Sequence, residues 1–123
     1  MDLNAFTDLQ KQALVDLLTL GMYADGNLDL IEDELARGVL NSIPFSSDSA
    51  RQYFIDASFT RARKNSASPE AARKYVAHIG NKFSTQSLRC QARDALEESL
   101  KSDNQLADRE RELLAMVAEE FKL

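Results

Sequence analysis

The sequence predicts an all-α fold of six to seven helices, on two observations. The composition favours helix, because Ala, Leu, Glu, Lys, Gln and Arg dominate while the chain has only four glycines and two prolines. Hydrophobic side chains also recur with the 3.6-residue period of amphipathic helices. The chain has 123 residues, of which 44% are hydrophobic. Residues 1–123 are therefore expected to form a single globular domain.

The first two helices are expected to form a hairpin. The apolar face of the first helix consists of Leu9, Ala13, Leu17, Leu20 and Ala24. Asp25-Gly26 ends this helix, because glycine readily adopts a positive φ. The next helix is predicted to begin at Asp29, with Glu32 reaching back as in a capping box, and to end before Pro44.

The third and fourth helices are predicted from their capping residues. Ser46, Ser47 and Asp48 offer caps for a helix that ends in the basic stretch 61–64, which suits a helix C-terminus. Ser68-Pro69 then begins a helix with Pro at its first position, and Gly80 ends it. The basic stretch 61–64 is expected to be a solvated helix end, or else a docking patch for an anionic partner.

The last two helices are predicted from apolar faces. Ser84 is expected to begin the fifth helix and Asp108 the sixth. Their predicted buried faces are Leu88, Ala92, Ala95, Leu96 and Ser99 in the fifth, and Leu113, Leu114, Val117 and Phe121 in the sixth.

Charge and cysteine content exclude several classes of function. The net charge of −5 and pI near 4.9 disfavour nucleic acid as a partner, because backbone binding needs concentrated Lys and Arg. No leader pattern and no apolar run of about 20 residues is present, so a cytoplasmic protein without direct membrane insertion is expected. Cys90 is the only cysteine and His78 the only histidine, too few for a zinc site. His78 is expected to be structural or on the surface, and Cys90 to be a small packing residue.

The two ends of the chain repeat one another at an offset of 78 residues. The shared pattern is D-[GN]-x-L-x3-E-x-E-L, which begins at Asp25 in the first copy and at Asp103 in the second. Small residues match as well, Gly21 with Ser99, which indicates a close helix approach at the same level in both copies. The repeat predicts two pseudo-twofold-related helical hairpins around the third and fourth helices.

The repeated acids predict a cation site. A chain that reverses after Asp25 brings this carboxylate toward Glu32, and the second copy does the same with Asp103 and Glu110. If the hairpins pack back to back, the four carboxylates converge, and a cation or a basic side chain is then needed to keep them ionised. Oxygen ligands alone favour Ca²⁺ or Mg²⁺. An EF-hand is excluded, because Leu30 occupies the position of the required glycine.

These two acidic stretches resemble those of the tellurite-resistance TerB family and its TerB-like relatives. The resemblance rests on Ala24-Asp25-Gly26-Asn27-Leu28 with Glu32, and on Ser102-Asp103-Asn104-Gln105-Leu106 with Glu110. It implies a TerB-like helical domain with a divalent-cation site at the acids. It also implies a role in tellurite resistance or general stress response, with an unknown protein partner in a membrane-associated complex, and no catalytic reaction.

Two alternatives need no metal. Asp25, Glu32 and Glu110 fit a purely structural interpretation as turn and first-turn acids, and Arg109 and Arg111 could neutralise the carboxylates instead of a cation. Neighbouring acids at positions 29, 33, 34 and 112 are expected to be solvated. The favoured function is thus a non-enzymatic stress-response module that binds a divalent cation and a protein. The alternative is a purely structural helical adaptor. No nucleophile or base motif indicates an enzyme.

Overall fold

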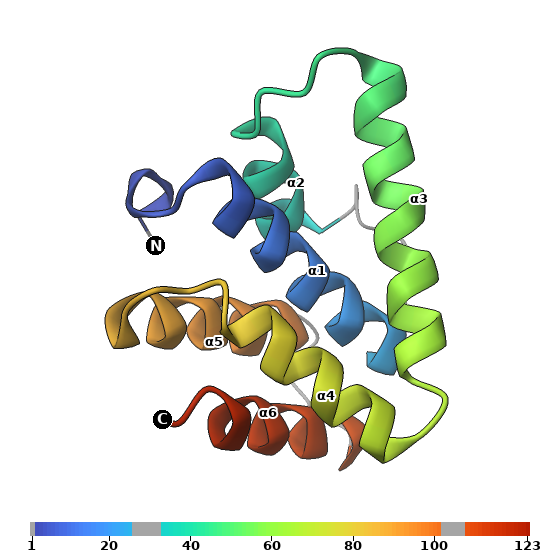
Figure 1. Cartoon of the computed structure of the whole chain (residues 1–123), viewed down its shortest axis with the longest axis vertical. Helices are drawn as coiled ribbons and strands as arrows, with labels where there is room; N and C mark the ends of the chain where they lie inside the picture. Colours follow the sequence, from blue (N-terminus) through green and yellow to red (C-terminus); the bar gives the residue numbers. More distant parts are fainter. Residues whose placement is uncertain (1, 26–32, 102–107) are drawn as a thin grey trace.

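The computed structural model describes residues 2–25, 33–101 and 108–123, and in these ranges the chain is all-α with no strand (Figure 1). The elements are η1 (Leu3–Ala5), α1 (Asp8–Asp25), α2 (Glu34–Asn41), α3 (Asp48–Asn65), α4 (Pro69–Gly80), α5 (Gln86–Leu100) and α6 (Asp108–Glu120). Six α-helices and one short 3-10 turn in this part of the chain confirm the predicted fold class.

Capping side chains begin the helices near the predicted positions. Ser47 Oγ accepts from the backbone N–H of Ala50 at 3.0 Å, and Ser68 Oγ accepts from that of Ala71 at 3.1 Å. Each hydroxyl thus satisfies a donor that a helix N-terminus leaves without an intrahelical partner. Thr85, one residue after the predicted Ser84, is the cap of α5.

The predicted start of α2 is wrong. The backbone of Asp33 is extended, with φ −78° and ψ 113°, and its carboxylate Oδ1 accepts from Ala36 N at 2.9 Å. Asp33 is therefore the cap, and α2 begins at Glu34, so a helix from Asp29 cannot run on through this point. Asp29 itself lies outside the described residues.

Helix α1 is the centre of the fold and packs against each of the other five α-helices (Figure 1). Leu14, Val15, Leu17 and Leu18 in its middle are fully buried, as expected of a helix packed against several others. Leu9 is an exception to the predicted apolar face, because it lies in the first turn of α1 and is 70% exposed.

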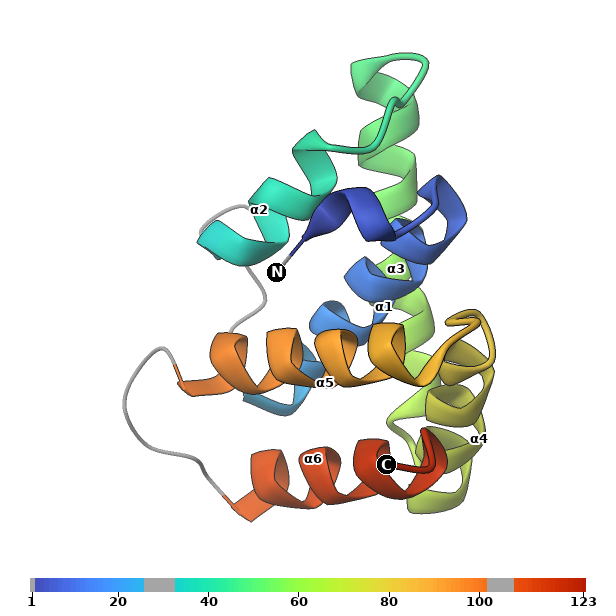
Figure 2. The ribbon, with the colours of Figure 1, turned by 90° about the vertical axis from the view of Figure 1, so that its left-hand side faces the viewer.

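Close approach of α1 and α5 depends on Gly21. A Cβ atom at this position would lie 2.6 Å from Leu96 Cδ1 and 3.4 Å from Leu100 Cδ2. The distance to Leu96 is shorter than van der Waals contact. The predicted close contact is therefore confirmed for Gly21. Helices α5 and α6 also pack on each other, side by side in Figure 2, and α1 packs on α2, so each hairpin of the repeat is a packed pair.

Candidate functional site

The two acidic stretches lead to the same end of the molecule. Ser99 Oγ, at the end of α5, donates to Asp33 Oδ2 at 2.6 Å, just before α2 begins. Ala24, at the end of α1, and Arg109, in the first turn of α6, line one hollow. Figure 2 shows the start of α2, the end of α5 and the start of α6 on one side of the molecule. The helix ends that flank the repeated acids are thus paired, the end of α5 with the start of α2 and the end of α1 with the start of α6.

Glu110 is the predicted ligand whose side chain the structure describes, and it is buried. It lies in the first turn of α6 and is only 2% exposed, whereas its neighbours Arg109 and Arg111 are exposed. The first turn of a helix suits an acid, because the helix dipole is positive there. The helix dipole favours an acid in the first turn whether or not its side chain is buried, so it does not by itself explain the burial of Glu110.

The other three predicted ligands are not described at the level of their side chains. Asp25 is the last residue of α1, and its side chain lies outside the described part. Glu32 and Asp103 lie wholly outside the described residues. Among the side chains that the structure describes, no three His, Cys, Asp or Glu groups are arranged to hold a metal ion.

One acid expected to be solvated has a structural role instead. Asp33 is half-buried, and its two oxygens accept from Ala36 N and from Ser99 Oγ. Glu34 and Glu112 are exposed, as predicted. The sequence signal for Asp33 was present, since an acid three residues before Ala36 suits an N-cap, but Asp29 offered the same signal earlier in the chain.

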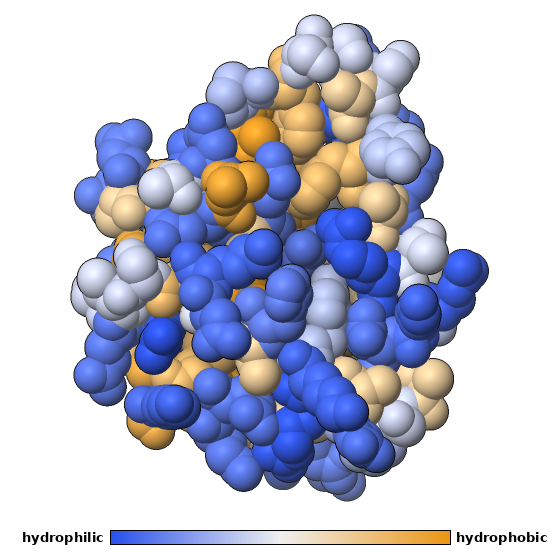
Figure 3. Space-filling model, viewed as in Figure 1, coloured by the Kyte–Doolittle hydropathy of each residue, from blue (hydrophilic) through white to orange (hydrophobic). Residues whose placement is uncertain are grey.

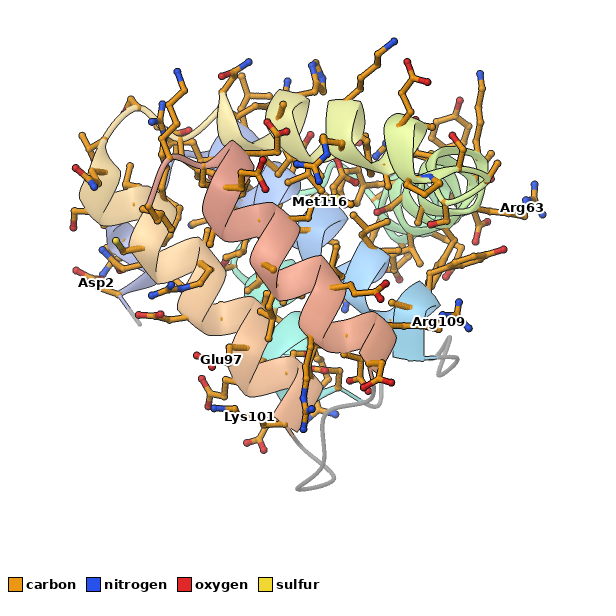
Figure 4. All side chains as sticks on the ribbon, turned by 90° about the horizontal axis from the view of Figure 1, so that it is seen from below. Asp2, Arg63, Glu97, Lys101, Arg109 and Met116 are labelled. Carbon is orange, nitrogen blue, oxygen red and sulfur yellow. The ribbon has the colours of Figure 1, made fainter. Side chains whose placement is uncertain are left out.

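An apolar hollow of about 300 Å³ lies beside the first turn of α6. Leu20 of α1 and Leu113 and Met116 of α6 supply its apolar wall, and Arg109 stands at its edge. Figure 4 shows Arg109 near the end of α1 and Met116 further along α6, toward α4. This hollow is concave and mostly apolar, which suits a hydrophobic side chain of a partner.

A second polar group, which the sequence did not predict, joins α1 to α3. Arg61 Nη2 donates to Asp16 Oδ1 at 2.8 Å, and Ser58 Oγ donates to the same oxygen at 2.7 Å. Burial lowers the pKa of Arg61, but the hydrogen bond and charge of Asp16 outweigh it, so this pKa lies above its usual value. The prediction of a solvated basic end over 61–64 is therefore wrong for Arg61, while Arg63 and Lys64 are exposed.

Tyr75 of α4 reaches the same polar group. Burial, and then the negative charge of Asp16, raise the pKa of Tyr75 to about 12, against the opposing effect of the Arg61 guanidinium. His78, one turn further along α4, is exposed, as expected. The residues that meet here are 42 and more positions from Asp16 in sequence, so no local pattern could have predicted their contact.

Searches against models of known protein families, against curated proteins and against solved structures find no match to this chain. The resemblance to the TerB family therefore depends on the residues of the two acidic stretches. In the described part of the chain, no helix combines the length and the hydropathy needed to cross a membrane.

Proposed function

We propose that the chain is a non-enzymatic binding module that holds a divalent cation, Ca²⁺ or Mg²⁺, and docks a protein partner. The ligands of the cation are Asp25, Glu32, Asp103 and Glu110. The observation that carries the proposal is the burial of Glu110, which is 2% exposed in the first turn of α6.

Burial of a carboxylate is costly unless charge or hydrogen bonds compensate it. A divalent cation compensates several carboxylates at once and prefers oxygen ligands. The Ser99–Asp33 hydrogen bond of 2.6 Å joins the end of α5 to the start of α2, and one hollow is lined by Ala24 at the end of α1 and by Arg109 at the start of α6. That arrangement supports a site shared by both copies of the repeat.

The broader role that we propose follows the TerB resemblance. The protein takes part in tellurite resistance or in a general stress response in the cytoplasm, through a protein partner in a membrane-associated complex. The apolar hollow next to α6, with Leu113 and Met116 in its wall, supports the docking part of this role. Oxygen ligands without a nucleophile motif in the sequence support a binding function over catalysis.

A thermal melt of chelator-treated protein, with and without millimolar Ca²⁺, Mg²⁺ or Mn²⁺, tests the cation site. A cation present at about 100 times its Kd adds about 2.7 kcal/mol to the free energy of unfolding, a shift of several degrees. We expect one of the cations to raise the Tm of the unsubstituted protein. We expect Asp25→Asn and Glu110→Gln each to remove that rise.

Glu112→Gln is the matched control, because Glu112 lies two residues further along α6 and is exposed. It should keep the full response to the cation. If no cation changes the Tm, or if Glu112→Gln and Glu110→Gln behave alike, the repeated acids are not a cation site.

A purely structural adaptor is the second candidate, and Asp33 favours it. This acid of the first stretch is used as an N-cap and as an acceptor for Ser99, with no need for a metal. If all the repeated acids have such roles, Asp25→Asn and Glu110→Gln lower the Tm equally with and without cations. The same melts therefore separate the two functions.

A further inference from the structure

A cavity of about 310 Å³ lies where α1, α3 and α4 meet. Its polar lining includes Asp16 of α1, Arg61 of α3, and Tyr75 and His78 of α4, with Lys82 just beyond the end of α4. Figure 3 shows hydrophilic residues gathered over the centre of this face, with hydrophobic ones above them between α2 and α3. Asp16 lies nine residues before the end of α1, about 13 Å along the helix axis, so the cavity is separate from the acidic stretches.

The hydroxyl of Tyr75 is the unusual group in this cavity. Tyr75 is only 7% exposed, and in the part of the chain that the structure describes its O–H donates to no protein group, although the Arg61 guanidinium lies close enough to lower its pKa. Buried hydroxyl groups nearly always have a partner, because loss of hydration without replacement costs free energy. The O–H of Tyr75, in a residue that lines the cavity, is therefore left to donate to an acceptor that enters it.

The charge of Asp16 is already compensated. Its Oδ1 accepts from Arg61 and from Ser58, at 2.8 and 2.7 Å. The guanidinium of Arg61 has five N–H donors in all, more than this carboxylate oxygen uses. Lys82 adds a second positive charge and His78 a further donor. The lining thus has more donors and more positive charge than Asp16 can satisfy.

One side of the cavity is apolar. Phe54 of α3 lies under the Arg61 guanidinium, 5.8 Å from ring centroid to Cζ, and Leu9 of α1 lines the cavity while 70% exposed. An exposed leucine next to a half-buried phenylalanine provides a surface for the apolar body of a ligand. The volume is at the lower limit for small-molecule sites, about 300 to 1,000 Å³, so the ligand has to be small.

We propose that this cavity binds a small organic anion, whose carboxylate or phosphate accepts hydrogen bonds from Tyr75 and Arg61 and whose apolar body packs on Phe54. His78, three residues after Tyr75 on α4, adds a donor at the exposed rim, and Lys82, just beyond the end of α4, adds a positive charge that attracts the anion. This inference does not depend on the cation site.

An NMR titration of the ¹⁵N-labelled protein tests the proposal at constant ionic strength. Benzoate and phenyl phosphate are the two probes, and benzylamine and benzyl alcohol have the same ring without the negative charge. We expect saturable shifts of the amides around Tyr75 and Arg61 with at least one of the two anions. Tighter binding of phenyl phosphate identifies a phosphate ligand, and tighter binding of benzoate a carboxylate.

Two substitutions locate the anion. Tyr75→Phe keeps the ring and removes the hydroxyl, and we expect affinity for the better anion to fall about tenfold, as for loss of a hydrogen bond to a charged group. Lys82→Gln should weaken it by about threefold, as for a charge at an exposed rim. Lys74→Gln is the control, because the Lys74 side chain is on the same helix and 79% exposed, and it should bind like the unsubstituted protein.

The proposal is overturned if neither anion gives saturable shifts, or if benzylamine or benzyl alcohol binds as tightly. It is also overturned if Tyr75→Phe, shown to be folded by its amide spectrum, binds the anion with unchanged affinity. In that case a water molecule is the ordinary partner of the Tyr75 hydroxyl.

Discussion

Asp16 and Glu110 both have carboxylates withdrawn from solvent, yet their surroundings differ. The Asp16 side chain is 16% exposed and accepts from Arg61 and Ser58 of α3. Glu110 is 2% exposed in the first turn of α6, next to Arg109, which lines a hollow with Ala24 at the end of α1. The chain itself thus balances Asp16, and we propose that a cation binds at Glu110. A buried acid is therefore evidence of a site only after its partners within the chain are considered.

The largest expected difference between these acids is in their response to a cation. Glu110→Gln should lose the stabilisation of about 2.7 kcal/mol that a cation gives at about 100 times its Kd. Asp16→Asn should keep that stabilisation in full, because Asp16 is not a proposed ligand, although its stability without the cation falls. Urea unfolding with chelator and with the cation measures both quantities. Equal loss of the response in both variants would contradict the comparison.

The next effect concerns the ion pair that balances Asp16. Arg61→Met should lower the free energy of unfolding by about 2 kcal/mol, between the values for a surface pair and a buried one. The pair falls between these cases because the Arg61 side chain is 40% exposed and the Asp16 side chain only 16%. Arg63→Met is the control on the same helix, because Arg63 is exposed, and it should stay within about 0.5 kcal/mol. Urea unfolding measures both, and similar losses would mean that the pair contributes little.

A smaller effect tests the close approach that brings α5 alongside α1. Gly21→Ala places a Cβ atom 2.6 Å from Leu96 Cδ1, and such overpacking costs about 1 to 3 kcal/mol. Leu96 can yield in part, so we expect a loss of about 1.5 kcal/mol. Gly38→Ala on α2 is the opposite case, since no atom lies within 4 Å of its Cβ. It should stabilise the protein by about 0.5 kcal/mol through helix propensity. Thermal unfolding of both variants provides the measurement, and a stabilising Gly21→Ala would contradict the tight contact.

The fold was predictable where local signals act alone. Caps such as Ser47 and Ser68, and Pro69 at the first helical position, begin α3 and α4 as expected. Local signals failed where two capping residues compete, because Asp29 and Asp33 look alike in sequence, and Asp33 is the one that caps α2 and accepts from the distant Ser99. The start of α2 was therefore placed too early.

For the candidate sites, too, local sequence patterns predicted some residues and missed those that only tertiary packing brings together. Glu110 was a candidate because it matches Glu32 in the sequence repeat, and the structure shows that it is buried, while its role as a ligand stays a prediction. The group around Asp16 was missed, because it depends on the packing of α3 and α4 against α1. Arg61 looked like part of a solvated basic end, and only tertiary structure directs its side chain toward Asp16. Whether Asp25, Glu32 and Asp103 join Glu110 stays a prediction.

The smallest effect concerns Tyr75, which lies next to Asp16, and depends on pH. The pKa of Tyr75 is raised to about 12 in the folded protein by burial and by Asp16, against about 10 in the unfolded chain. The folded state therefore holds this proton more tightly. Its contribution to stability is complete below pH 10 and is lost as the pH rises from about 10 through about 12. At about pH 11 we expect the loss to be about 1 kcal/mol, measured by urea unfolding.

Tyr75→Phe isolates this loss from the titration of other groups, because it has no phenol at this position. Its stability should fall less than that of the unsubstituted protein between about pH 9 and pH 11, by the same amount of about 1 kcal/mol. Tyr53→Phe is the matched control, since Tyr53 is 78% exposed, and it should follow the unsubstituted protein. Identical pH dependence in Tyr75→Phe and Tyr53→Phe would mean that Tyr75 reaches solvent and that Asp16 does not act on its hydroxyl. The cavity next to Asp16 would then have no buried phenol to offer a ligand, whereas the expected difference places an ionisable hydroxyl at its base.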